Sequence, residues 1–237
     1  MNKKSLICTL SLLAVFGCAT HKTYIDKETA FCNDDAGITV CVDKEQQPIT
    51  GLVKLNSSEV SVYNGKFDGL AKAYGENGNL LDELEFREGV INGTHRHYRA
   101  NGKLLFEKNF KNNKRNGPAK IFYESGNLLK EEDWENDELN GVTREYYSEG
   151  KLRSEENYKN GKRNGLSKSY YGNGILHREE NYKDDQLDGI AKAYDINGVL
   201  RQEVEYKNNR KNGSFKLYSK DGKLLSDVVY KDGQLVK

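Results

Sequence analysis

The sequence predicts an all-β fold, an elongated single-layer antiparallel meander of tandem 24-residue β-hairpin repeats. The first observation is a glycine that recurs every 24 residues without insertion or deletion, and we define it as position zero of each repeat. The second is a leucine at position eleven and an aromatic residue at position seventeen of every repeat. The third is a second glycine at position nine, which most often follows Asn or Asp and is then typical of a hairpin turn. Repeats of this kind occupy residues 69–237, and their first glycines are Gly69, Gly93, Gly117, Gly141, Gly165, Gly189 and Gly213.

The N-terminus predicts a processing signal. Lys3 and Lys4 precede an uncharged apolar run at residues 5–16, which is too short to span a membrane. The letters VFGC that follow resemble the lipobox of bacterial lipoproteins. This resemblance implies that residues 1–17 are a signal peptide and that Cys18 carries lipid, which anchors firmly because more than one acyl chain is attached. The alternative is an ordinary secreted protein in which Cys18 has no such role.

Residues 18–25 are expected to form a short tether, and residues 26–68 an N-terminal cap. Within the cap, eight residues separate Cys32 from Cys41, and the letters DDAG after Cys32 supply a turn. An even pair of cysteines in an oxidising compartment predicts a disulfide across this hairpin. The last part of the cap predicts a shortened repeat, because it begins with GLVKL and its first glycine, Gly51, lies only 18 residues before the next repeat.

The register of each hairpin follows from its turn and from its charges. A two-residue type I′ turn at positions eight and nine places position three opposite position fourteen. Position three is always basic and position fourteen always acidic, so both arguments predict the same pairing. If the connecting loop spans positions eighteen to twenty-three, each acid also faces the base of the next repeat. The pairs are Lys72–Glu83, Arg96–Glu107, Lys120–Glu131, Arg144–Glu155, Lys168–Glu179, Lys192–Glu203 and Lys216–Asp227.

The opposite face of the sheet is predicted to carry a row of aromatic rings from position seventeen. With the same connecting loop, each ring faces and covers the first glycine of the next repeat, which would explain why position zero lacks a side chain. An alternative is that the rings only pack on their neighbours and bind nothing. The basic pair Lys162 and Arg163, on a connecting loop, has no role in this scheme. The rings form the candidate binding surface: Phe86, Phe110, Trp134, Tyr158, Tyr182, Tyr206 and Tyr230.

The composition argues against several classes of function. The charge is nearly balanced, with 37 basic and 36 acidic residues, so no overall field favours nucleic acid or an anionic membrane. With 15 Tyr, 8 Phe and 1 Trp, the chain is too aromatic for a disordered protein. The sequence contains no G-x-S-x-G motif and singles out no pair of carboxylates for glycoside hydrolysis. We therefore expect no catalytic residue and no cofactor.

No metal site is expected either. His95 and His97 alternate on one strand and so share a face, but the other repeats carry unrelated residues at these positions. The acidic loops at residues 136–138 and 184–185 lack the spaced oxygen ligands of a calcium-binding loop. The cysteines of the cap have no nearby His or Cys that would complete a zinc site.

The unit GLSKSYYGNGILHREENYKDDQLDG, from Gly165 to Gly189, resembles the MORN-repeat-variant unit. The resemblance covers the chain from Gly69 to the C-terminus. It implies an array of antiparallel hairpins in which the rings of position seventeen line a groove. Similar chains are often grouped with YwqK-type antitoxins, and together with a lipobox this would imply an immunity lipoprotein that acts outside the cytoplasm.

We expect a non-enzymatic, lipid-anchored repeat protein of the bacterial cell envelope that acts as a scaffold for a protein partner. The alternatives are an immunity or antitoxin-type lipoprotein and a carbohydrate- or peptidoglycan-binding module with the rings as stacking platforms. Binding to a lipid surface is disfavoured, because the basic residues are paired with acids. By analogy with Gram-negative sorting, Ala19 after Cys18 favours the outer membrane.

Overall fold

The computed structural model describes residues 23–25, 30–35, 38–55 and 57–236, which form strands, turns and loops. The expected signal peptide and Cys18 lie outside these residues. Within the described part of the chain, no helix is long and apolar enough to cross a membrane. The chain divides into two compact units, unit 1 at residues 1–115 and unit 2 at residues 116–237, and the boundary falls inside strand β10 (Lys114–Phe122).

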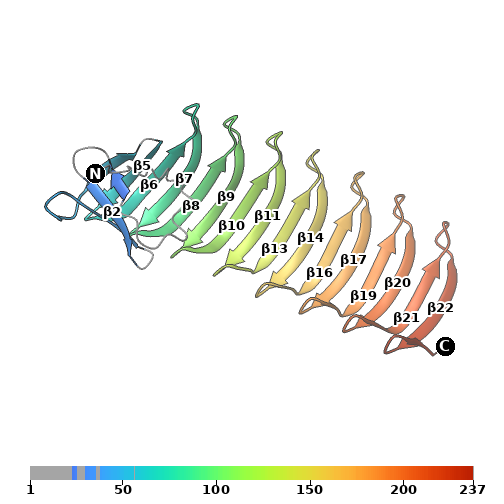
Figure 1. The fold of residues 1–237 in the computed structure, drawn as a ribbon. Coiled ribbons are helices and arrows are strands. Elements are labelled where there is room, and N and C mark those ends of the chain that lie inside the picture. Colours follow the sequence, from blue (N-terminus) through green and yellow to red (C-terminus); the bar gives the residue numbers. More distant parts are fainter. Residues whose placement is uncertain (1–22, 26–29, 36–37, 56, 237) are drawn as a thin grey trace, which may run out of the picture. The chain divides into compact units, whose positions relative to one another are not determined.

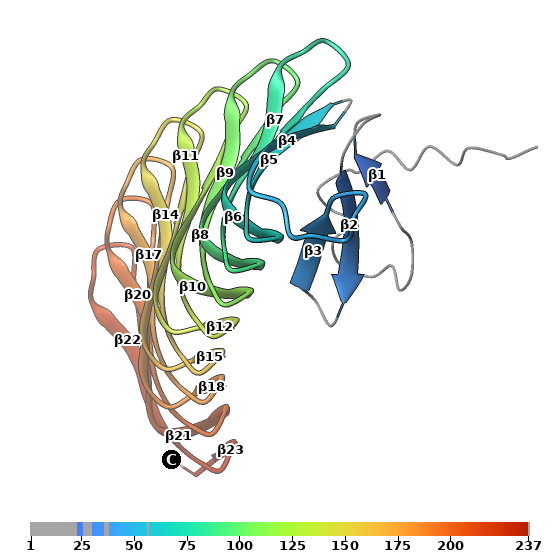
Figure 2. The same cartoon turned by 90° about the vertical axis from the view of Figure 1, so that its left-hand side faces the viewer.

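Unit 1 is built from consecutive antiparallel strands. From β4 onward each strand pairs with the next along the chain, and the β4–β5 hairpin occupies the predicted shortened repeat. The β2–β3 hairpin lies on the concave side of the curved strands β6–β9 (Figure 2). The strands are β1 (Thr23–Ile25), β2 (Ala30–Asp35), β3 (Ile38–Val42), β4 (Gly51–Leu55), β5 (Ser58–Tyr63), β6 (Lys66–Tyr74), β7 (Leu80–Arg87), β8 (Val90–Tyr98) and β9 (Leu104–Lys111).

Unit 2 repeats one hairpin without interruption. Its long strands lie side by side in chain order, and short strands extend the connections between repeats (Figure 1). The predicted all-β fold of tandem antiparallel hairpins is confirmed. After β10 the strands are β11 (Leu128–Glu135), β12 (Glu138–Leu139), β13 (Gly141–Tyr146), β14 (Leu152–Lys159), β15 (Lys162–Arg163), β16 (Gly165–Tyr170), β17 (Leu176–Lys183), β18 (Gln186–Leu187), β19 (Gly189–Tyr194), β20 (Leu200–Lys207), β21 (Arg210–Tyr218), β22 (Leu224–Lys231) and β23 (Gln234–Leu235).

The predicted charge register is confirmed. Lys168 lies opposite Glu179 in its own repeat and opposite Glu155 of the preceding repeat. Where the side chains meet, the base bridges both acids: Arg96 Nε lies 2.7 Å from Glu107 and its Nη1 lies 3.1 Å from Glu83. We call this side of the sheet the charge face. Such partly exposed pairs each contribute only about 0.2–1 kcal/mol, so they specify register more than they stabilise.

The predicted location of the type I′ turn is wrong. Between β16 and β17, Tyr171 N donates to Ile175 O at 2.8 Å and Gly174 N donates to Tyr171 O at 2.8 Å. The loop therefore has three residues, of which only Gly174 has a positive φ, 90°. The two successive positive-φ residues of a two-residue turn lie in the other connection, where Asp184 has φ 48° and Asp185 has φ 66°.

The predicted partner of each ring is also wrong. Tyr182 lies opposite Gly165 of its own repeat and opposite Leu187 of the next connection, not opposite Gly189. At Gly189, where φ is 115°, an added methyl group would lie 3.2 Å from Cβ of Asn181. Position zero is therefore glycine because of its backbone conformation and because the side chain at position sixteen of the preceding repeat fills the space, not because a ring covers it.

A second tyrosine row joins neighbouring repeats in unit 2, and the sequence did not reveal its role. At position six, each tyrosine hydroxyl donates to the backbone carbonyl of position five in the next repeat. The bonds are Tyr123 to Tyr146 at 2.7 Å, Tyr147 to Tyr170 at 2.7 Å and Tyr171 to Tyr194 at 2.9 Å. These bonds fix three successive hairpins to the repeat that follows each of them, as nearest-neighbour contacts do in other repeat proteins.

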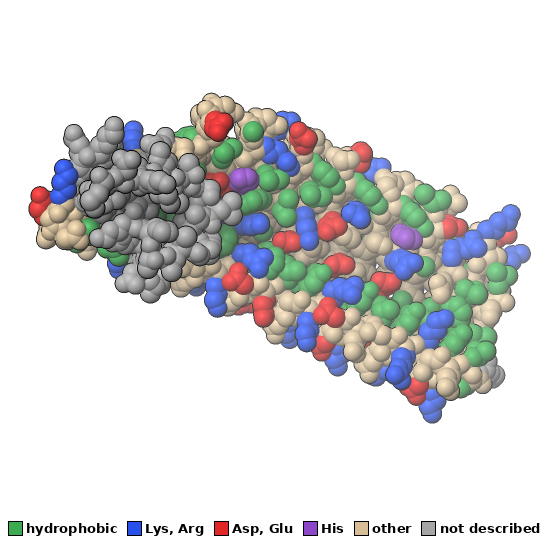
Figure 3. All heavy atoms as spheres, viewed as in Figure 1, with side chains coloured by type: hydrophobic (Ala, Val, Ile, Leu, Met, Phe, Trp, Pro, Cys, Tyr) green, Lys and Arg blue, Asp and Glu red, His purple; other side chains and the backbone are tan. Residues whose placement is uncertain are grey.

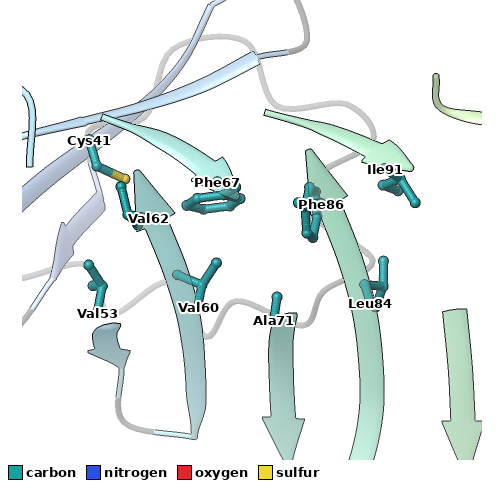
Figure 4. Packing of buried hydrophobic residues seen from close by; sticks show 9 residues of the cluster. All are labelled: Cys41, Val53, Val60, Val62, Phe67, Ala71, Leu84, Phe86 and Ile91. Carbon is teal, nitrogen blue, oxygen red and sulfur yellow. The ribbon is translucent and has the colours of Figure 1, made fainter. Parts of the chain in front are cut away.

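The apolar core described in unit 1 joins one residue of β3 to residues of strands β4–β8. The Phe67 and Phe86 rings meet edge to face at 5.4 Å, and Cys41 is fully buried beside them (Figure 4). Cys41 is disulfide-bonded, and the residue opposite it in the β2–β3 hairpin is Cys32, as the predicted disulfide requires. The cluster consists of Cys41, Val53, Val60, Val62, Phe67, Ala71, Leu84, Phe86 and Ile91.

Candidate functional site on the ring face

The predicted ring row separates into two groups with different surroundings. In unit 1, Phe86 is only 5% exposed inside the core and Phe110 packs against that core. The burial of Phe86 removes it from the candidate binding surface that the sequence predicted, whereas Phe110 is only partly buried. In unit 2 the position-seventeen rings are half-buried, and the side of the sheet that carries them is called the ring face. They are Trp134, Tyr158, Tyr182, Tyr206 and Tyr230.

Three of the rings in unit 2 have their polar atom fixed by a carboxylate. The acid lies at position fifteen, two residues before the ring, and alternate residues of a strand share one face. The last two rings have Val204 and Val228 at that position and therefore lack this partner. The bonds are Trp134 Nε1 to Glu132 at 3.0 Å, Tyr158 Oη to Glu156 at 2.7 Å and Tyr182 Oη to Glu180 at 2.9 Å.

Burial and these carboxylates raise the pKa of two of the tyrosines. Burial raises the pKa of the Tyr158 hydroxyl, and its hydrogen bond to Glu156 raises it further. Burial and Glu180 raise the pKa of Tyr182 in the same way. Each hydroxyl donates a hydrogen bond to its acid, and this bond holds the ring in one orientation.

Cations from β15 and β21 cover two of the rings. The Arg163 guanidinium lies 4.0 Å from the Tyr182 ring centroid and its Nε lies 3.8 Å from Asp185, which gives this residue a role that the sequence analysis did not find. Lys211 Nζ lies 4.8 Å from the Tyr230 ring centroid. The overlooked signal is an alternation at position twenty-two, which reads Leu139, Arg163, Leu187 and Lys211.

Charged residues of both signs border the rings. Lys130 Nζ lies 2.8 Å from Glu132 and 3.6 Å from Glu145, and Arg178 lies 3.5 Å from Glu180. Figure 3 likewise shows acidic, basic and hydrophobic side chains intermingled over unit 2 rather than a region of one sign. The surface can therefore offer stacking, hydrogen-bond donors and hydrogen-bond acceptors together.

The two histidines that share a strand in unit 1 contact one carboxylate. His95 Nε2 and His97 Nδ1 lie 2.9 Å and 2.7 Å from the same Asp82 oxygen, and the His97 ring stacks on Phe106. Burial alone would raise the pKa of Asp82, but the hydrogen bonds from the two histidines lower it below the ordinary value. Across the residues that the structure describes, no three His, Cys, Asp or Glu side chains are arranged to hold a metal ion.

Comparison with known proteins identifies the repeat. A family model described as "MORN repeat variant" matches residues 67–88, 91–112, 115–136, 139–160, 163–184, 187–208 and 211–232. No curated protein matches the sequence. One similar solved structure is alternansucrase in complex with isomaltononaose, at 14% identity and a TM-score of 0.24. That similarity covers 86% of this chain but only 18% of the alternansucrase chain, and its TM-score is too low to indicate a shared fold or function.

Proposed function

Because the chain belongs to the MORN repeat variant family, we propose that it is a non-enzymatic scaffold that binds a protein partner on the ring face of unit 2. The observation that supports this proposal most directly is the row of half-buried rings, three of which are fixed by a carboxylate. Aromatic residues are the usual anchors of protein interfaces. A ring already held in one orientation loses little conformational entropy when it becomes an anchor.

The acids of the ring face have partners that favour a structural role over catalysis. Glu156 and Glu180 each accept a hydrogen bond from a tyrosine two residues away. Glu132 is almost buried and contacts both Lys130 and Trp134. A general base or nucleophile needs an oxygen directed at a substrate, and these oxygens are directed at neighbouring side chains.

Removal of the rings tests the binding surface. We expect Tyr158→Ala to weaken binding of the identified partner about tenfold or more, as interface anchors do, whereas Tyr158→Phe should weaken it only a few-fold, because the ring remains. The measurement is pull-down from envelope extracts, identification of the captured protein, and titration of that purified protein. Tyr194→Ala, on the charge face, is the matched control.

The same experiment separates the alternatives. Unchanged affinity in a folded Trp134→Ala, Tyr158→Ala, Tyr182→Ala triple variant would overturn the proposed surface. Binding to purified peptidoglycan, lost in the triple variant and without a protein partner, would favour the carbohydrate alternative. A captured secreted toxin, together with protection of sensitive cells by this chain, would favour the immunity alternative.

We also place the protein at the bacterial envelope, with lipid on Cys18 and the outer membrane as its location. The support is the sequence alone: the charged start, the apolar run and the letters VFGC. We expect Cys18→Ser to move the protein from the membrane fraction to the soluble fraction, because the acyl chains supply the anchor. Detergent phase partition of the two forms is the measurement, and retention of the variant with membranes would contradict the lipid anchor.

A further inference from the structure

Strand β4 begins with a glycine that has the conformation of a repeat but lacks the neighbour of a repeat. Gly51 has φ 145°, close to the 134° of Gly141, yet a methyl group added there would have no atom within 4 Å. At six of the other position-zero glycines, an added methyl group would contact the side chain that lies eight residues earlier, which is position sixteen of a full repeat. These contacts join Gly69 to Ser61, Gly93 to Glu85, Gly141 to Asp133, Gly165 to Asn157, Gly189 to Asn181 and Gly213 to Glu205.

The rest of β4 also follows the repeat pattern. With Gly51 as position zero, Lys54 falls at position three, where every repeat carries a base, and Leu52 falls at position one. Lys54 is exposed and lies opposite Glu59 of β5. Among the described strands, only β5 pairs with β4, and β1 comes close to β4 without pairing with it. Relative to the pattern inside the repeats, no described acid-bearing strand pairs with the other edge of β4.

Strand β22 presents the complementary edge. It pairs with β21 along its length, and on its other side Tyr230 and Lys231 pair with β23 while the Val229 carbonyl accepts a hydrogen bond from Val236 N at 2.8 Å, so the edge is open only from Val228 toward Leu224. Asp227 is exposed at position fourteen, and Val229 is 38% exposed at position sixteen. In the register of the repeats, these two residues would meet a base and a glycine of a following first strand.

We propose that β22 of one copy of this chain pairs with β4 of a second copy. The register that joins successive repeats then places Asp227 opposite Lys54, as Glu155 lies opposite Lys168. The exposed side chain of Val229 then lies beside Leu52, which is 54% exposed and becomes covered, while the Val229 carbonyl keeps its hydrogen bond to Val236 of its own chain. The two joined surfaces differ from each other, so the association is head-to-tail and can continue from copy to copy.

The contact is small, and this sets the conditions under which it forms. A strand pair of about five residues buries less than the roughly 800 Å² per partner of a stable interface, so a weak association is expected. Attachment of many copies to one membrane would raise their effective concentration. The proposal concerns the two edge strands and does not depend on the ring face as a binding surface.

Charge exchange across the two edges tests the proposal. The purified full chain is examined by sedimentation velocity over increasing concentration, where its mean mass should rise. Lys54→Asp and Asp227→Lys should each lower the association constant about three- to tenfold. Both substitutions in one chain should restore association, because the exchanged edges are again complementary. Lys111→Asp and Glu76→Lys are the matched controls and should leave it unchanged.

Cross-linking shows whether the contact has the proposed register. In a mixture of isotopically labelled and unlabelled chains, a zero-length carbodiimide should join Lys54 of one copy to Asp227 of the other. A chain that stays monomeric over the whole concentration range overturns the proposal. Association that responds equally to the edge and control substitutions, or a double variant that fails to recover, overturns it too.

Discussion

The variant Gly141→Ala is expected to lose about 2–5 kcal/mol of unfolding free energy. Gly141 has φ 134°, which an L-residue adopts only with strain, and the added methyl group would lie 2.8 Å from Cβ of Asp133. Asp133 cannot easily retreat, because its strand β11 is paired on both sides, with β10 and β13. Urea unfolding followed by circular dichroism measures the loss, and amide exchange in β11 and β13 shows where it acts.

Gly51→Ala is the matched control for this prediction. Gly51 has a similar φ of 145°, but a methyl group there meets no atom within 4 Å. Gly51→Ala should therefore lose only the unfolding free energy that corresponds to backbone strain, about 1–3 kcal/mol. If dilute Gly51→Ala and Gly141→Ala chains lose the same free energy, the contact with position sixteen is not a reason for glycine at position zero.

The sequence predicted the charge register through its charges, because the turn argument that supported the same pairing assigned the wrong turn. The base at position three and the acid at position fourteen specify pairing within a repeat, and the constant 24-residue spacing repeats that pairing between repeats. An extra residue in a turn leaves this pairing intact because a bulge absorbs it, as at Ser169 and Tyr170. The wrong turn assignment therefore left the predicted fold correct.

The turn type could not be assigned in the same way. Both connections of a repeat are rich in Asn, Asp and Gly, and all three residues tolerate positive φ. The Asn-Gly pair at Asn173 and Gly174 forms a three-residue loop, whereas Asp184 and Asp185 form the two-residue turn. The wrong position for the type I′ turn then led to the wrong glycine opposite each ring.

The row of position-seventeen rings shows that the repeat period alone does not determine which ring is buried. Phe86 and Tyr182 occupy the same position of their repeats, and nothing in the repeat distinguishes a core ring from a surface ring. The difference comes from β3, which lies far from Phe86 in the sequence and brings Cys41 into the cluster that contains it. A tertiary contact of this kind has no signal in the period of the repeat.

Phe86→Ala is accordingly expected to lose about 3–5 kcal/mol of unfolding free energy, the usual loss when a buried aromatic ring is replaced by alanine. Phe86 is 5% exposed, its ring meets Phe67 at 5.4 Å, and both belong to the cluster that includes Cys41. The cavity should also weaken the packing of the β2–β3 hairpin, so exchange of the Cys41 amide should accelerate. Thermal and urea unfolding, with amide exchange in β3, measure both effects.

Tyr206→Ala provides the comparison at the same position of another repeat. Tyr206 is half-buried in unit 2 and has Val204, not an acid, two residues before it, so its loss should be about 1–2 kcal/mol. This substitution should leave exchange in β3 unchanged, because Tyr206 does not belong to the cluster around Cys41. Equal losses for the two variants, or unchanged exchange at Cys41 in Phe86→Ala, would mean that β3 does not depend on the ring beneath it. A large loss only for Phe86→Ala would instead show that one repeat position serves as core in unit 1 and as surface in unit 2.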